Sequence, residues 1–326
     1  YNEYRKDHNV NRKEAAMGRF LNPGNEAFSE VIHSEIYVDK TPLLEYTNRV
    51  ISTTSKFICS SRPRRFGKSI TAEMLSAYYS KGSDSRELFA DYAIHKAESF
   101  EKHLNQYDVI HFDVQWCMMD AGNADCVVEY INNGILQELK EKYGELIPDT
   151  VKTVYGAMSY IKAAAGNKFV VIIDEWDVLI RDEAQNHKVQ EEYIDFLRGM
   201  FKGSEPSKYI ALAYLTGILP IKKLKTQSAL NNFEEFTMLD AGRMAPYVGF
   251  TEAEVHDLCD RYGQNYEQVK SWYDGYSLEG YQVYNPKAVV SVSVRGKFRS
   301  YWSETASYEA IVPLININYD GLKNSI

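Results

Sequence analysis

Several features that would place this chain in a common class are scarce or missing. The chain has only four cysteines, which form no CxxC pair and are too scattered for a disulfide framework, so we expect free thiols. His111, Cys117 and Cys126 do not have the spacing of zinc ligands. The GxSxG and HExxH motifs are absent as well. The sequence therefore gives no support to a disulfide scaffold, a zinc site or these two kinds of hydrolase.

Long apolar runs and an excess of positive charge are also missing. No run approaches the length that crosses a bilayer, and residues 1–7 do not read as a secretory signal. The net charge of −8 and the pI of about 5.5 argue against broad electrostatic binding to nucleic acids or anionic membranes. We expect a cytoplasmic globular protein that does not bind membranes.

The chain does contain an almost complete phosphate-binding loop. Residues 62–69 read Arg-Pro-Arg-Arg-Phe-Gly-Lys-Ser. In the usual GxxxxGK[ST] spacing, backbone N–H groups surround the phosphates, the lysine reaches the β- and γ-phosphates, and the hydroxyl binds Mg²⁺. Gly67, Lys68 and Ser69 match, but Arg62 stands in place of the first glycine, which would allow a positive φ or a close backbone approach. Either the loop is degenerate or it opens differently.

The flanking residues have the order that such a loop needs. Residues 56–61 are typical of a buried strand, and apolar residues at 70, 74, 75 and 78 have helical spacing. A strand, the loop and a helix therefore follow one another, which favours a nucleotide site over a chance Gly-Lys-Ser.

The rest of the chain predicts an α/β fold. Further strands are expected at 107–114, 168–175 and 209–217, and helices at 124–143, 150–164 and 187–202. Their alternation predicts a parallel sheet with helices on both faces. We expect a polar arm at 1–16, a core at 17–240, and a smaller, tyrosine-rich and mostly helical lid region at 241–326, where Thr251 has the properties of a helix N-cap.

Two acids end the strongest predicted strand. Asp174 lies where a Mg²⁺-binding acid is expected, and Glu175 lies where a carboxylate could polarise an attacking water. An unpaired carboxylate at a buried strand end is costly, which favours a functional role, although two hydrated acids at a frayed end would give the same pattern. Thr216 closes the last predicted strand, where it could sense the γ-phosphate or belong to an ordinary turn.

The arginines of the loop leave three interpretations open. Arg62, Arg64 or Arg65 could contact the nucleotide or act on a neighbouring subunit, because arginine binds phosphates in a bidentate manner. They could instead pair with acids such as Asp39 or Asp177 and hold the loop. A contact with a nucleic-acid backbone is the third interpretation.

A set of short segments resembles one protein family. The segments are Tyr37-Val38-Asp39-Lys40-Thr41, residues 62–69, Ile173-Asp174-Glu175-Trp176-Asp177, Thr216-Gly217, Tyr273-Asp274-Gly275-Tyr276 and Tyr284-Asn285-Pro286. Together they resemble the bacterial AAA-ATPase-like proteins, P-loop ATPases of the ASCE type that are often fused to a C-terminal PD-(D/E)XK nuclease-like module. The resemblance runs from about Met17 to the end and makes Arg62 a family trait, while the nuclease-like module is not found in 1–326.

The resemblance implies roles for particular residues. Lys68 and Ser69 match nucleotide-binding positions, Ser69 and Asp174 would hold Mg²⁺, Glu175 matches the catalytic acid, and Thr216 matches the sensor strand. Catalytic roles are thus expected for Glu175, Lys68 and Thr216. The residues expected to bind the nucleotide are Arg62, Pro63, Arg64, Arg65, Phe66, Gly67, Lys68, Ser69 and Ile70.

Three functions follow from these observations, and all stay open at the level of the sequence. The first is Mg²⁺-dependent ATP binding and hydrolysis that regulates an attached or partner effector. The second is a slow or non-hydrolysing nucleotide-gated switch or interaction module. The third, nucleic-acid binding by this segment, conflicts with the negative net charge, so nucleic acid is expected only as an indirect partner. A homo-oligomer is a further expectation.

Overall fold

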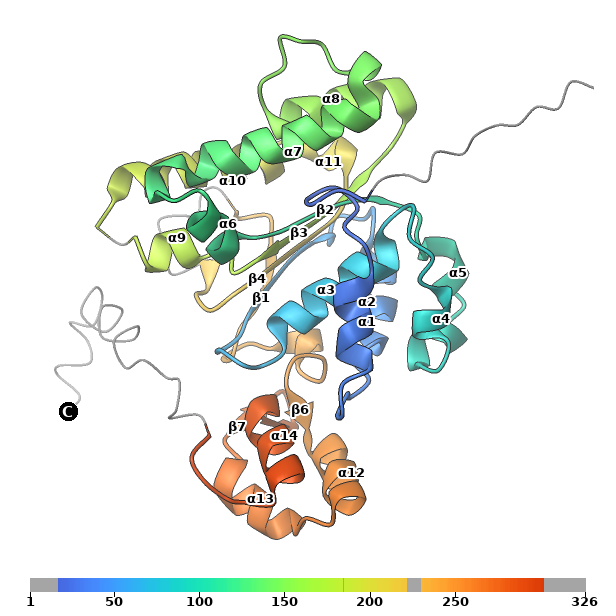
Figure 1. Ribbon diagram of the computed structural model, residues 1–326, viewed down its shortest axis with the longest axis vertical. Helices are drawn as coiled ribbons and strands as arrows, with labels where there is room; N and C mark the ends of the chain where they lie inside the picture. The colour runs from blue at the N-terminus through green and yellow to red at the C-terminus, as the bar shows by residue number, and fades with distance from the viewer. Residues whose placement is uncertain (1–16, 184, 222–229, 302–326) are drawn as a thin grey trace, which may run out of the picture.

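The computed structural model describes residues 17–183, 185–221 and 230–301, and Figure 1 shows their arrangement. The expected arm at 1–16 and the last part of the expected lid region, 302–326, lie outside the described residues. The division of the chain into arm, core and lid therefore stays a prediction.

The centre of the molecule is a five-stranded sheet in which every neighbouring pair is parallel. The strand order is β2-β3-β4-β1-β5. The strands are β1 (Phe57–Ser61), β2 (Asp108–Asp113), β3 (Phe169–Asp174), β4 (Ile210–Gly217) and β5 (Glu234–Phe236). The first four confirm the predicted strands to within a few residues. All residues of β1, β3 and β4 are buried, as their continuous apolar sequence predicts for strands covered on both faces.

Sequence reasoning missed β5. This strand is three residues long, contains two glutamates, and within the described ranges pairs with β1 at the edge of the sheet. Its extended form is stabilised by the neighbouring strand and not by a β-forming sequence, so no local pattern indicates it.

Helices cover both faces of the sheet, so the α/β prediction is confirmed at this level (Figure 1). One hydrophobic cluster joins alternate strand residues such as Val171 and Ile173 to helices of residues 114–201, and a second joins Val170 and Ile172 to helices of residues 26–103. The first group is α6 (Val114–Asp120), α7 (Val127–Tyr143), α8 (Val154–Ala165), α9 (Val178–Arg181) and α10 (His187–Phe201). The second group is α1 (Glu26–Ile32), α2 (Pro42–Val50), α3 (Lys68–Tyr79), α4 (Arg86–Phe89) and α5 (Phe100–His103). The short helix α11 (Pro206–Tyr209) leads into β4.

The chain after β5 forms a compact group with its own hydrophobic cluster. Its helices are α12 (Glu252–Tyr262), α13 (Tyr266–Tyr273) and α14 (Pro286–Arg295). The helix start at Thr251 is confirmed, because Thr251 and Glu254 form a reciprocal capping box. The mostly helical prediction did not include a three-stranded antiparallel sheet of β6 (Phe250–Thr251), β8 (Tyr281–Tyr284) and β7 (Tyr276–Leu278).

The β7–β8 hairpin explains why that sheet was missed. Its two-residue turn, Glu279-Gly280, has positive φ at both positions, which matches the hairpin type usually signalled by Asn-Gly or Asp-Gly. Because glutamate occupies the first turn position, the sequence lacks the Asn-Gly or Asp-Gly pair by which such a hairpin is usually predicted.

Within the described part of the chain, no helix is both long and apolar enough to cross a membrane. All four cysteines are free thiols, and Cys126 is the exposed one.

Candidate functional site

The predicted phosphate-binding loop connects β1 to α3 at the carboxyl end of the sheet. Gly67 has φ = +85° directly before the first residue of α3, and Arg65 has φ = +71°. A Cβ on Gly67 would meet no atom within 4 Å, so the glycine is needed for its backbone conformation and not for space. A left-handed arginine is strained, which is common where a loop is shaped for a ligand. The amino terminus of α3 presents backbone N–H groups on the same side.

Arg62 anchors the loop instead of lining it. Its side chain is fully buried, and Nη1 donates to the carbonyl oxygens of Ser61 and Phe236 at 3.1 and 3.0 Å. Burial lowers the pKa of Arg62 to about 10. Asp39 and Asp177, the acids considered as partners, bind other groups. Arg62, which replaces the first glycine of the motif, thus connects the loop to the edge strand β5.

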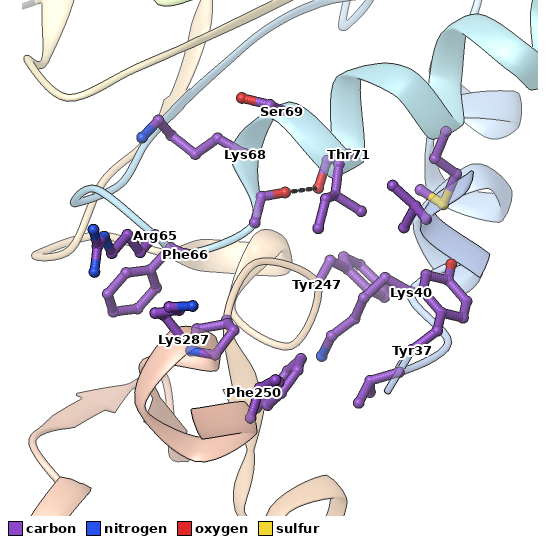
Figure 2. A pocket seen from close by; sticks show the side chains of 18 of the residues that line it. Tyr37, Lys40, Arg65, Phe66, Lys68, Ser69, Thr71, Tyr247, Phe250 and Lys287 are labelled. Atoms are coloured by element: carbon purple, nitrogen blue, oxygen red, sulfur yellow. Dashed lines mark hydrogen bonds between the residues drawn. The ribbon is translucent and has the colours of Figure 1, made fainter. Parts of the chain in front are cut away.

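A cavity of ≈470 Å³ lies beside the loop (Figure 2). The expected nucleotide-binding residues that line it are Arg64, Arg65, Phe66, Gly67, Lys68, Ser69 and Ile70. Arg62 and Pro63 are not among the lining residues, although Pro63 contributes its carbonyl oxygen to Lys68 Nζ at 3.3 Å.

The cavity has a charged end and an apolar end. Cations at or near the loop are Arg64, Arg65, Lys68 and Lys287, and the acid among the described lining residues is Glu175. Figure 2 shows Tyr37, Tyr247 and Phe250 on the side away from Lys68 and Ser69, so this end is mostly aromatic; its one charged lining residue among the described ones is Lys40, which is paired with Glu254. This distribution suits an elongated ligand with an anionic end and a flat apolar end.

Sequence reasoning did not place the N-terminal and C-terminal walls of this cavity. Lys40, which precedes α2, donates to Glu254 of α12 at 2.6 Å and to the Pro246 carbonyl at 2.8 Å. The ring of Phe66 packs edge-on against Tyr276 of β7 at 5.3 Å between centroids. The sequence signal for these walls was that Tyr37–Thr41, Tyr273–Tyr276 and Tyr284–Pro286 belong to the segments that carry the family resemblance. Contacts between segments far apart in the chain build these walls.

Asp174 and Ser69 meet at the carboxyl end of β3. Asp174 is 3 % exposed, and burial raises its pKa to about 6. The negative charges of Asp113 and Glu175 add to the rise, while a hydrogen bond from Ser69 opposes it. Asp113 lies opposite Asp174 in the sheet, and its carboxylate caps α6 by accepting from the Trp116 amide at 3.0 Å. The structure thus brings the two expected metal ligands together and gives Asp113 a structural role.

The donor set fits Mg²⁺. One carboxylate and one hydroxyl offer hard oxygen ligands, and Mg²⁺ usually takes only one or two protein ligands together with waters and phosphate oxygens. A cation here would also relieve the cost of ionising the buried Asp174. In the described residues, no group of three or more His, Cys, Asp or Glu side chains is arranged to hold a metal.

Glu175 lies between two cations. Its backbone has φ = +48°, and its Oε1 is 3.5 Å from Lys68 Nζ. Its Oε2 is 3.5 Å from Nη1 of Arg181, at the end of α9. The structure brings Lys68 and Glu175 together as expected, and it adds Arg181, which sequence reasoning missed.

Asp177 connects the loop that follows β3 to the residues that follow β4. It is fully buried, and its Oδ2 accepts from the amides of Ile218 and Leu219 at 3.2 and 2.7 Å. A Cβ on Gly217 would lie 2.5 Å from Asp177 Oδ1, so only glycine fits after Thr216. Asp177 therefore joins the end of β4 to the loop after β3.

Thr216 lies on β4, between β1 and β3. It is fully buried and does not line the cavity, and its Oγ1 has no hydrogen-bond partner among the described residues. Its carbonyl oxygen accepts from the Trp176 amide at 3.0 Å. A role as sensor of a bound phosphate stays a prediction.

Glu73, one helical turn after Ser69, is a partly buried carboxylate close to Asp174 and Asp113, and its ionisation should affect stability in a pH-dependent way. Burial raises its pKa to about 7, and the charges of Asp174 and Asp113 add to the rise. His111 Nδ1 is 4.0 Å away but offers no charge at pH 7, because burial lowers its pKa to about 4. An acid whose pKa is raised by folding destabilises the protein increasingly as pH rises from its unfolded value of about 4.5 toward 7.

We therefore expect Glu73→Gln to raise the unfolding temperature at pH 8 and much less at pH 5. With allowance for the one-third exposure of this side chain, the gain is about 1–2 kcal/mol, or a few degrees. Thermal unfolding in EDTA at both pH values measures it, with the exposed Glu145→Gln as the matched control. An equal shift at both pH values would show that Glu73 carries no such ionisation cost.

The fold and this site define an α/β protein with a Gly-Lys-Ser loop between a strand and a helix at the carboxyl end of a parallel sheet. The chain belongs to the predicted AAA-ATPase family, AAA-ATPase-like, whose model matches residues 23–226. The chain is also 25 % identical, over 307 residues, to an uncharacterized protein in the vnfD 5′ region of Azotobacter chroococcum mcd 1. The match covers 90 % of this chain and 55 % of that protein, so the chain spans little more than half the length of this relative.

Proposed function

We propose that this chain binds ATP with Mg²⁺ and hydrolyses its terminal phosphoanhydride bond. The observation that carries the proposal is the meeting of Lys68, Ser69 and Glu175 at the charged end of one cavity, with the buried Asp174 directly behind Ser69 and hydrogen-bonded to it. The sheet order supports an ASCE-type P-loop domain, because β4 separates the loop strand β1 from the acid strand β3.

Each residue has a role that its position supports. Lys68 and the N–H groups of the α3 amino terminus bind the phosphates, and Ser69 and Asp174 bind Mg²⁺, which neutralises phosphate charge when bound. Glu175 accepts a proton from water as the water oxygen bonds to the γ-phosphorus. The bond from that phosphorus to the bridging oxygen breaks, giving ADP and phosphate, and the proton passes on to solvent.

The apolar end of the cavity suits the nucleobase. Figure 2 shows the rings of Tyr37, Tyr247 and Phe250 near this end, and Ile70 and Met74 of α3 also line the cavity. Aromatic and aliphatic walls favour a flat base, and the volume of ≈470 Å³ lies in the range of small-ligand sites. Inorganic phosphate alone would leave this end without a partner.

The direct test is nucleotide binding and turnover by the chain itself. We expect ATP to bind more tightly with Mg²⁺ than with EDTA, and phosphate release to require Mg²⁺. Fluorescence titration with an ATP analogue and a phosphate-release assay measure the two quantities. Absence of binding with Mg²⁺ at low ionic strength would overturn the proposal.

A slow nucleotide-gated switch is the second candidate. The contacts of Phe66 with Tyr276 and of Lys40 with Glu254 favour it, because they connect the loop and the cavity wall to the chain after β5. Nucleotide retained through purification with negligible turnover would favour this function over rapid hydrolysis. Regulation of an attached nuclease-like module or other effector, and assembly into a homo-oligomer, are further proposals that rest on the family resemblance.

A further inference from the structure

The Arg181 guanidinium lies close to three carboxylates. Its Nε is 2.8 Å from Asp182 Oδ1, and its Nη1 is 3.3 Å from Asp177 Oδ2 and 3.5 Å from Glu175 Oε2. The side chain is only 4 % exposed. Burial opposes its charge, but the carboxylates outweigh burial and raise the pKa of Arg181. This cation is therefore fixed, charged and close to the site.

The anchor of Arg181 is itself rigid. Asp177, one helical turn earlier, is fully buried and accepts two backbone hydrogen bonds from Ile218 and Leu219 after β4. Asp177 and Asp182 would already compensate the charge of Arg181. The contact with Glu175 is additional, so a purely structural role does not account for it.

The two oxygens of Glu175 have separate cationic partners. Oε1 faces Lys68 and Oε2 faces Arg181, each at 3.5 Å. A phosphate bound to Lys68 would compete for Nζ and leave Oε1 without a cation. Oε2 would keep Arg181, because the anchors of Arg181 lie outside the cavity.

We propose that Arg181 is the positioning residue of Glu175: it holds Oε2 so that Oε1 faces the ligand when Lys68 moves to the phosphate. This inference rests on the proposed hydrolysis and adds a residue to it. Arg181 does not line the cavity, so its effect on turnover should pass through its contact with Glu175.

A double-mutant cycle tests this dependence. In the wild-type background, Arg181→Gln should lower kcat about tenfold or more and change KM less than about threefold, because Lys68 and Ser69 are untouched. In the Glu175→Gln background, the same substitution should change the remaining turnover less than about twofold. Arg181→Lys should restore part of the activity, since lysine keeps the charge but loses the planar fork.

Thermal unfolding of the same four proteins gives a readout that needs no activity. Arg181→Gln should lower the unfolding temperature less in the Glu175→Gln background than in the wild type, because one of its ion contacts is already gone. Arg198→Gln, which removes an exposed arginine paired with Asp195 on α10, is the matched control and should leave turnover unchanged.

The outcomes separate this inference from the proposed function. If the wild type hydrolyses ATP and Arg181→Gln is fully active, the role of Arg181 is overturned and the proposed hydrolysis stands. The same holds if Arg181→Gln lowers kcat by the same factor in the wild-type and Glu175→Gln backgrounds. A wild type that hydrolyses no nucleotide would overturn both. If Arg181→Gln does not fold, Arg181→Lys takes its place in the cycle, and equal losses in both backgrounds again contradict the proposal.

Discussion

Replacing Glu175 by glutamine is expected to lower kcat by about two to four orders of magnitude, the usual contribution of a general base. Glutamine has nearly the same shape but cannot accept the proton of water. Binding should persist or become slightly tighter, because the neutral side chain no longer competes with the phosphates for Lys68 Nζ, now 3.5 Å from Oε1. Single-turnover hydrolysis and equilibrium titration with an ATP analogue separate the two effects.

The exposed Glu192→Gln on α10 is the control for this experiment. It removes a glutamate whose carboxylate lies 3.7 Å from the exposed Lys188 ammonium on the same helix, and it should leave turnover unchanged. Mg²⁺-dependent turnover that survives Glu175→Gln would show that another group activates the water. Loss of binding in Glu175→Gln would instead indicate a structural role for the carboxylate.

Replacing Lys68 by alanine is expected to weaken nucleotide binding about ten- to a hundredfold, because a hydrogen bond to a charged group contributes about 1.5–3 kcal/mol. Lys68 is 5 % exposed and reaches the cavity from the first turn of α3. Lys68→Arg should not restore binding, since the larger guanidinium does not fit the position of an ammonium held by the Pro63 carbonyl.

Equilibrium titration at fixed ionic strength measures this loss, with Lys188→Ala as a control. The Lys188 side chain is 74 % exposed on α10, so the control removes the same charge far from the cavity. An affinity of Lys68→Ala equal to that of the control would remove the loop from the proposed site. Unfolding temperatures of both variants show whether either change alters the fold.

Four of the five sheet strands could be predicted because they are long, apolar and buried on both faces. The same pattern placed Asp174 and Glu175 at a strand end, and the Gly-Lys-Ser spacing placed Lys68 and Ser69 before a helix. Strand β5 and the β6–β8 sheet could not be predicted in this way. These strands are only two to four residues long; β5 and β6 are held by pairing with distant segments, and the turn of the β7–β8 hairpin lacks the usual Asn-Gly or Asp-Gly signal.

The roles of the arginines could not be predicted from composition. Four basic residues occur within residues 62–68, and although Arg62 replaces the first glycine of the motif, nothing in the sequence shows which of the arginines face the cavity and which are buried. In the fold, Arg62 turns inward to the carbonyl of Phe236, while Arg64 and Arg65 line the cavity. The strand β5 decides this difference, because it supplies the acceptor.

The sequence by itself determines the parallel α/β core, the Gly-Lys-Ser loop before a helix, and the two acids at the end of β3, because these features depend on local hydrophobic runs and short motifs. Only the tertiary structure decides what surrounds them. Residues far from the loop in sequence, namely Lys40, Arg181, Tyr276 and Lys287, reach the site or its anchors through helix packing and strand pairing. Such contacts depend on the whole fold, since their energy comes from burial and charge pairing between distant segments.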